Sequence, residues 1–321
     1  MYPYVVVSRS IQVLMEKRQD ETFKYLFSNI NNNNTIQQTH NVECVFETQY
    51  NSTGSGGYES KLIIRVHESK KRQLLRQCLA EFVGLMFFTF MVGGSVITAN
   101  FYFSDPVIKI VLIALIQAMT LAAIIWFTSG VSGCQLNPAV TVSLVFTGRM
   151  GILNGILFII MQCCGALAGS ALIKAAVPGH YEGNLGATTL APTIPFARGF
   201  FLEMMGTCLL CLVVLGMSVY NEWDPKLGRY APLGIGCAVY AGVAMLNPYT
   251  GGSLNPARSF GPAVLSDTWH YHYLYWFGPI AGGIVAALLW RFILSEKVAL
   301  VDRPYADYAN TPANAGGHAG K

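Results

Sequence analysis

The amino-acid sequence predicts an all-α membrane protein in which six transmembrane helices and two re-entrant half-helices form an inverted repeat. Three observations support this fold class. The chain has 321 residues, of which 53% are hydrophobic and only 12% charged, about half the charged fraction of ordinary soluble domains. The tripeptide Asn-Pro-Ala occurs twice, at residues 137–139 and 255–257, each time after a loop of small residues. An acidic residue in an apolar segment, Glu81 or Glu203, precedes each tripeptide by a similar distance.

The chain begins with a polar stretch, residues 1–73, which contains four consecutive asparagines at 31–34 and a Gly/Ser-rich run at 52–57. Such a segment buries too little apolar surface to offset the entropy of ordering it, so we predict a disordered tail. A basic cluster closes the tail just before the first apolar segment, at Lys70, Lys71, Arg72 and Arg76. We expect a second tail at residues 297–321.

Between the tails, residues 74–296 form the predicted channel domain. It holds six apolar segments, each near the ~20 residues that a helix needs to cross a bilayer. We predict transmembrane helices at about residues 78–102, 107–127, 151–177, 199–220, 231–247 and 273–294. Three spans fall in each half of the domain, about residues 74–177 and 195–296. The second half therefore enters the membrane upside down relative to the first, and a transport site is expected where the two repeats meet.

A short helix is predicted after each tripeptide, at about residues 138–147 and 256–265. Asn is a favoured helix N-cap and Pro a favoured first helical residue, so Asn137-Pro138-Ala139 and Asn255-Pro256-Ala257 each indicate a helix start. Ten residues rise about 15 Å, half of the ~30 Å thickness of the hydrocarbon core. Two such half-helices entering from opposite faces would meet near the midplane.

The loops before the tripeptides, residues 130–136 and 250–254, predict a water-filled path. Irregular backbone at membrane depth is tolerated only where protein buries it or water solvates it. Loop carbonyls would supply hydrogen-bond acceptors along the path, and the amides of Asn137 and Asn255 would supply donors. The partial positive charge at the two helix N-termini opposes cations and interrupts a proton-conducting chain of waters. We therefore predict a passive pore for water and small neutral solutes.

Three charged residues lie within apolar segments. An unpaired Arg258 would cost at least ~2.5–3.5 kcal/mol there; we favour a pore-lining role for it, with a structural salt bridge as the alternative. For Glu81 and Glu203 we favour a supporting role, as buried groups that hold the re-entrant loops. A proton relay is the weaker alternative, because no chain of acids or histidines accompanies them.

Lys and Arg in the short loops predict the orientation. They are concentrated on the side that holds both termini, which we therefore expect to be cytoplasmic, in the plasma membrane. The other side has Lys109, Lys174 and Arg198, and a loop with His270 and His272 that we expect to be solvated. The net charge of +4 is too small to suggest nucleic acid. The sequence contains no phosphate-binding loop, nucleophile elbow or pair of metal ligands, so we expect no enzyme activity, metal or cofactor.

These motifs resemble a known family. The doubled Asn-Pro-Ala, the run Ala80-Glu81-Phe82, the run Asn255-Pro256-Ala257-Arg258-Ser259 and the six spans are similar to those of the aquaporins, or major intrinsic proteins. The resemblance covers about residues 74–296. It implies the aquaporin fold, one pore per subunit, a homotetramer in membrane lipid, and passive flow without a cofactor.

In the aquaporins an aromatic/arginine constriction sets selectivity. The resemblance places it at Gln117, Val243, Gly252 and Arg258, and only the Arg matches the water-selective pattern. Val and Gly are smaller than the His and the Cys or Thr that they replace, which predicts a wider filter and favours glycerol or urea. Ser259 and the pair Tyr275-Trp276 nevertheless resemble water channels. The chain is thus similar to a water-channel lineage with a broadened filter, as in glycerol-permeable insect aquaporins.

Many aquaporins are blocked by mercurials at a Cys three residues before the second motif Asn, where this chain has Gly252. The symmetry-related residue of the first motif is Cys134, which is therefore the candidate mercurial site. Two other functions stay open at this point. One is a family member acting as an ion channel, and the other is an adhesion or signalling protein with a closed pore, which the long N-terminal tail keeps in view.

Overall fold

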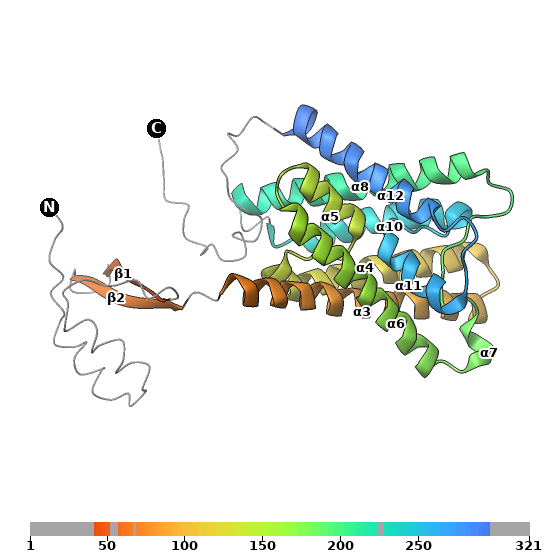
Figure 1. Ribbon diagram of the computed structural model, residues 1–321, viewed down its shortest axis with the longest axis horizontal. Coiled ribbons are helices and arrows are strands. Elements are labelled where there is room, and N and C mark those ends of the chain that lie inside the picture. The colour runs from red at the N-terminus through yellow and green to blue at the C-terminus, as the bar shows by residue number, and fades with distance from the viewer. Residues whose placement is uncertain (1–41, 52–56, 67–68, 224–227, 296–321) are drawn as a thin grey trace. The chain divides into compact units, whose positions relative to one another are not determined.

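The structure, a computed structural model, describes residues 42–51, 57–66, 69–223 and 228–295 of the chain (Figure 1). Most of the two predicted tails, residues 1–41 and 296–321, lies outside the described residues. The hairpin described next and the helical part form separate compact units.

Two antiparallel strands form within the stretch that the sequence predicted to be disordered. They are β1 (Val42–Asn51) and β2 (Gly57–Val66), paired so that Val42 lies opposite Val66 and Asn51 opposite Gly57. The expectation of disorder therefore does not hold for these residues. The reason is local: both segments contain β-branched and aromatic residues, which favour strands, and a Gly/Ser run separates them.

The rest of the described chain is helical. Its long helices are α3 (Lys70–Tyr102), α4 (Pro106–Ser132), α6 (Ile152–Ala176), α8 (Phe196–Trp223), α10 (Ala231–Thr250) and α12 (Leu274–Leu289), the last continued by the π-helix η1 (Trp290–Leu294). Six spans in the described residues are long and apolar enough to cross a membrane, as the sequence predicted. The short helices are α5 (Pro138–Phe146), α7 (Gly179–Glu182) and α11 (Pro256–Ser266). The half-helices α5 and α11 were predicted; α7 and the π-helix were not.

Several helix ends differ from the prediction. Helix α4 continues to Ser132 rather than ending at residue 127, and α8 extends three residues beyond its predicted range at each end. Helix α3 begins at Lys70 rather than at residue 78, so the basic cluster forms its first two turns. Lys, Arg, Gln and Leu all have high intrinsic helix propensity, so the helix extends toward the N-terminus beyond its apolar part. Helix α10 continues through Pro248 to Thr250 instead of ending at Asn247, and stops at Gly251 in the left-handed conformation.

The two halves of the helical part interlock through the half-helices. Helix α5, from the first half, packs against α12 of the second, and α11 packs against α6 of the first. Glycines allow this close approach: a Cβ at Gly283 would collide with the carbonyl of Ala139, and a Cβ at Gly261 with the carbonyl of Ala166. Each half-helix is therefore held by the third span of the other half.

Two pairs of glycines, each four residues apart, form helix-packing faces. Gly165 and Gly169 of α6 face the backbone of α3, and Gly278 and Gly282 of α12 face the backbone of α8. None of these four positions has room for a Cβ without a shift of its neighbour. Small residues at such contacts are typical of helix association in membranes.

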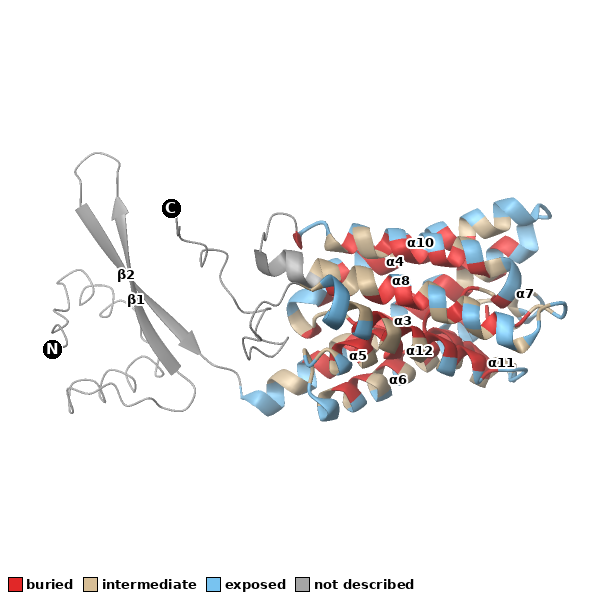
Figure 2. Ribbon diagram, turned by 90° about the horizontal axis from the view of Figure 1, so that it is seen from above, coloured by how far each residue is buried: buried red, intermediate tan, exposed pale blue. Residues whose placement is uncertain are grey.

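The outward faces of the helices are apolar. Trp126, Leu153 and Phe292 are 57%, 69% and 74% exposed, whereas buried residues are concentrated where helices face one another (Figure 2). A surface with many large exposed apolar side chains is stable only in an apolar environment. The six membrane-length spans place these side chains against lipid. The helical part is an integral membrane domain.

Candidate functional site

Both tripeptides begin a short helix, as the sequence predicted. Asn137 is the N-cap of α5, and its Oδ1 accepts a hydrogen bond from the backbone N–H of Ala139 at 2.9 Å. Asn255 is the N-cap of α11, and its Oδ1 accepts from the N–H groups of Ala257 at 3.0 Å and Arg258 at 3.3 Å. Each helix therefore uses the side-chain oxygen and leaves the amide NH₂ for other partners.

The NH₂ groups cross between the two halves of the chain. Nδ2 of Asn137 donates to the carbonyl of Leu254 at 2.8 Å, and Nδ2 of Asn255 donates to the carbonyl of Leu136 at 2.8 Å. An amide NH₂ carries two donors, so each asparagine keeps a second N–H that has no acceptor among the described residues. These two donors lie where the half-helices meet.

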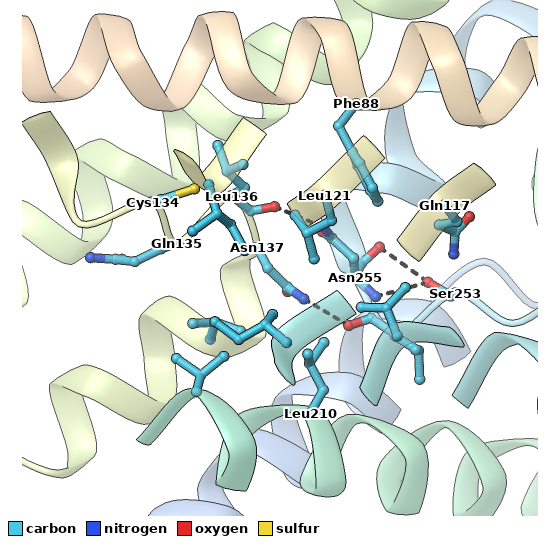
Figure 3. Close-up of a pocket in the computed structure, with 16 residues that line it drawn as sticks. Phe88, Gln117, Leu121, Cys134, Gln135, Leu136, Asn137, Leu210, Ser253 and Asn255 are labelled. Carbon is cyan, nitrogen blue, oxygen red and sulfur yellow. Dashed lines mark hydrogen bonds between the residues drawn. The ribbon is translucent and has the colours of Figure 1, made fainter. Parts of the chain in front are cut away.

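A cavity of about 30 Å³ is present at this meeting point (Figure 3). Both asparagines line it, with Gln117 on one side of them and Cys134 on the other. Its volume exceeds the ~10–15 Å³ that one water needs. Most of the remaining wall is apolar, and includes Phe88, Leu121, Leu136, Leu210 and Leu254. The cavity is therefore a narrow apolar space with polar groups at a few fixed points.

The two loops before the tripeptides have the same unusual backbone. Counting back from each asparagine, the fourth, third and first residues have positive φ. These are Gly133 (81°), Cys134 (52°) and Leu136 (49°) in the first loop, and Gly251 (78°), Gly252 (63°) and Leu254 (56°) in the second. Non-glycine residues rarely adopt this conformation, and each one costs of order 1–2 kcal/mol. The surrounding structure must hold these loops in place.

Two buried carboxylates hold them. Glu81 accepts four hydrogen bonds, from Ser132 Oγ at 2.6 Å, the N–H of Gln135 at 3.0 Å, the N–H of Leu136 at 2.7 Å and Gln162 Nε2 at 2.9 Å.

Glu203 accepts three hydrogen bonds in the mirror arrangement, from Thr250 Oγ1 at 2.6 Å and the N–H groups of Ser253 at 2.9 Å and Leu254 at 2.8 Å. Both glutamates are fully buried. Their contacts are those of loop supports. None of their hydrogen-bond partners among the described residues is an acid or a histidine, which a proton relay would need.

Hydroxyl groups add a second brace to each loop. Thr141 Oγ1 donates to Gln135 Oε1 at 2.8 Å, and in the second copy the hydroxyls of Ser253 and Ser259 lie 2.6 Å apart. At the start of the second loop, Tyr275 donates its hydroxyl to the carbonyl of Thr250 at 2.8 Å. The Thr141–Gln135 and Ser253–Ser259 hydrogen bonds each connect the residue two before an asparagine with the residue four after it.

The four predicted filter residues are all buried, and the structure brings two of them into contact. A Cβ at Gly252 would lie 3.2 Å from Val243 Cα and from its carbonyl oxygen. Gln117, 1% exposed, lines the cavity beside Asn255, and its Oε1 has no hydrogen-bond partner within the described chain. Val243, Gly252 and Arg258 do not line this cavity.

Arg258 is held by the segment between α6 and α8. Its Nη1 donates to the carbonyl of Gly186 at 2.8 Å, and its Nε is buried without a partner in the part of the chain that the structure describes. Next to it, Thr188 donates to Ser259 Oγ at 2.7 Å. The segment has to fold inward to make these bonds: Gly186 has φ +74°, and a Cβ there would lie 2.8 Å from Gly93 Cα.

Several of these supporting residues were missed from the sequence. Gln135 and Thr141 could have been found, because they align with Ser253 and Ser259 when the two motifs are superposed. Gln162, Gly186 and Thr188 offer no such pattern, since each lies far along the chain from the group that it contacts.

One expectation outside the membrane spans is wrong. His272 was expected to be solvated but is 8% exposed, and its Nε2 accepts a hydrogen bond from Trp276 Nε1 at 3.2 Å. Burial lowers the pKa of His272, because the charged imidazolium loses its hydration. The neutral form is therefore favoured at this position.

Comparison with known proteins places this geometry in a family. The sequence model described as "Major intrinsic protein" matches residues 68–290. Aquaporin C of Dictyostelium discoideum is 64% identical over 249 residues, which cover 78% of this chain and 91% of that protein. Aquaporin-1 of Rattus norvegicus is 34% identical over 233 residues, 72% of this chain and 86% of that protein.

The fold agrees with a solved structure. The aquaglyceroporin from Plasmodium falciparum superposes with a TM-score of 0.60 over 69% of this chain and 97% of its own, at 20% identity. That likeness concerns the fold alone, and the predicted resemblance to insect members stays a prediction. The family model and the relatives show that the chain belongs to the major intrinsic proteins, the aquaporins, whose members are membrane channels and not enzymes.

Proposed function

We propose that this aquaporin is a passive channel for water and small neutral solutes such as glycerol or urea. One observation carries the proposal. The amides of Asn137 and Asn255 are fixed at both ends by their hydrogen bonds, so that each retains one N–H beside the same cavity. Two fixed, uncharged N–H donors can bind the oxygen of a water or of a solute hydroxyl group. Such a site favours neutral solutes.

The same geometry supports exclusion of protons and cations. A water whose oxygen accepts from both asparagines has a fixed orientation and cannot relay a proton through that site. The N-termini of α5 and α11 add partial positive charge at the same place. A cation-conducting pore would need compensating acidic groups, and Glu81 and Glu203, the buried glutamates of the described residues, are occupied by the loops.

The filter residues support passage of solutes larger than water. Gly252 brings only a hydrogen atom toward Val243, and Val243 replaces a bulkier donor of the water-selective pattern. Gln117 adds an acceptor, Oε1, that no described residue uses. Arg258 remains as a fixed donor, because Gly186 holds it. A wide filter with an acceptor and a cation suits a polyol or urea.

For the assembly we propose a homotetramer in the plasma membrane with both termini in the cytoplasm. Basic residues are more frequent at the end of the helices where α3 begins and α12 ends, as the positive-inside rule requires of the cytoplasmic side. They are Lys70, Lys71, Arg72, Arg76, Arg149, Arg229 and Arg291. With this orientation, the loop before α5 enters from the cytoplasm and the loop before α11 from outside.

Expression in oocytes tests the function. Osmotic swelling, uptake of labelled glycerol and urea, and voltage-clamp current should be measured on the same cells, with surface expression quantified. We expect swelling and uptake without current. The matched control is Val243→Trp, which should fill the filter and remove the flux at equal surface expression. Current through the protein would favour the ion channel, and no flux despite surface expression would favour an adhesion or signalling role.

A further inference from the structure

The inverted repeat relates the filter to a second set of residues. Asn137 and Asn255 are 118 positions apart, and the same offset relates Ser132 to Thr250, Gly133 to Gly251 and Leu136 to Leu254. The stretch from α4 to α5 therefore matches the stretch from α10 to α11 without a gap. Applied to the four filter residues Gln117, Val243, Gly252 and Arg258, the offset gives Ile235, Ile125, Cys134 and Val140.

These four mirror-related residues, here called the inner ring, all line the cavity at the asparagines. They come from four different places: Ile125 from α4, Cys134 from the first loop, Val140 from α5 and Ile235 from α10. Ile125 and Val140 are 6% and 3% exposed. In Figure 3, Cys134 lies on the opposite side of the asparagines from Gln117. The ring therefore lies on the cytoplasmic side of the asparagines in the proposed orientation.

The inner ring and the filter differ in chemistry. The filter has an arginine and a glutamine amide, whereas the ring consists of two isoleucines, a valine and a thiol. The next polar side chain on that side is Gln135, which points away from the asparagines (Figure 3) and whose Nε2 has no partner among the described residues. A solute that leaves the asparagines must cross an apolar step before it reaches Gln135.

We propose that the inner ring is a second selectivity element, which discriminates among neutral solutes by how many hydrogen bonds they must give up. The proposal rests on the proposed channel function. A water molecule is small enough to keep hydrogen bonds to neighbouring waters as it passes, so it gives up few of them. A polyol has several hydroxyls, and an apolar constriction satisfies few of them, which is costly. In this proposal the pore has a broad filter on the extracellular side of the asparagines and an apolar constriction, the inner ring, on the cytoplasmic side.

The experiment compares two neighbouring isoleucines of α4 in proteoliposomes of the full chain. Ile125 lines the cavity, while Ile124, which is 3% exposed, belongs to the core without lining it. We expect Ile125→Ala to raise the ratio of glycerol to water permeability by roughly threefold or more, since removal of an apolar wall lets hydration persist. Ile124→Ala removes the same atoms from the core and should leave the ratio unchanged.

A second variant separates hydrogen bonding from width. Val140→Thr keeps the side-chain shape and adds a hydroxyl whose oxygen can accept from a solute, so it should also raise the ratio. If the wild type conducts water but the ratio of glycerol to water permeability is unchanged in both Ile125→Ala and Val140→Thr, the proposed selectivity role of the inner ring is wrong and the channel function stands. Equal ratios for Ile125→Ala and Ile124→Ala overturn it too. Absence of water flux in the wild type would instead overturn the channel function.

Discussion

Asn255 donates its side-chain amide to the main-chain carbonyl of Leu136 at 2.8 Å, although the two residues are far apart in the chain. The bond ties the start of the second half-helix to the loop that precedes the first. The reverse bond, from Asn137 to Leu254, has the same length. Each motif therefore serves both as the cap of its own helix and as the clamp on the other loop.

Asn255→Ser should separate these two roles. Serine is as good an N-cap as asparagine, but its side chain is too short to reach Leu136 and offers the pore no amide. We expect Asn255→Ser to retain the helix and lose most of the water flux. Asn255→Ala should in addition lose about 1 kcal/mol of stability from the missing cap. Thermal unfolding in detergent and stopped-flow water flux check both, and full flux in Asn255→Ser would contradict the assigned role of the amide.

The glutamates predict a graded effect on stability. An amide in place of a carboxylate replaces one accepting oxygen by an NH₂ donor that faces the donors of the loop. At least one buried hydrogen bond is then unmade, at a cost of about 1–3 kcal/mol. Glu81 accepts four hydrogen bonds and Glu203 three. We therefore expect Glu81→Gln to lower the unfolding temperature more than Glu203→Gln.

The same two variants test the alternative role. A proton-relay function requires that proton flux, measured with a pH-sensitive dye in proteoliposomes, exists in the wild type and falls in these variants. We expect no proton flux in any of the three proteins. Unchanged thermal stability in Glu81→Gln would show that the carboxylate does not hold the loop.

Val243→His should narrow the filter. The position lies against Gly252 with no room between them, so a larger side chain must project into the path. We expect glycerol flux to fall more than water flux, because the imidazole also restores a donor. Val243→Leu, apolar and of similar size, is the control that separates width from hydrogen bonding. If glycerol uptake is the same in all three proteins, residue 243 is not at the constriction.

Cys134 predicts where thiol reagents act. It lines the cavity, whereas the symmetry-related residue of the second loop, Gly252, has no thiol. We expect mercurials to reduce water flux in the wild type and to have no effect on Cys134→Ser. Cys163, Cys164 and Cys237 remain in that variant and serve as the internal control. Block that persists in Cys134→Ser would place the reactive thiol elsewhere.

Local rules were sufficient for much of this molecule. The apolar lengths predicted six spans, and cap chemistry at Asn137 and Asn255 predicted both half-helices to within about a turn. The start of α3 was predicted too late, because helix propensity continues into the basic cluster, which a criterion of membrane-length apolar segments excludes. The hairpin at residues 42–66 was missed because the composition of the whole tail outweighed two short strand-forming segments.

What the sequence determined by itself is the set of parts: the spans, the inverted repeat, and the two asparagines that cap the half-helices. These follow from hydrophobicity and capping, which depend on neighbours in the chain. Only the tertiary structure decided how the parts hold one another, through Gln162 on Glu81, Gly186 on Arg258, and each asparagine on the opposite loop. Those bonds join groups that are distant in sequence, and their geometry exists only after the two halves have packed.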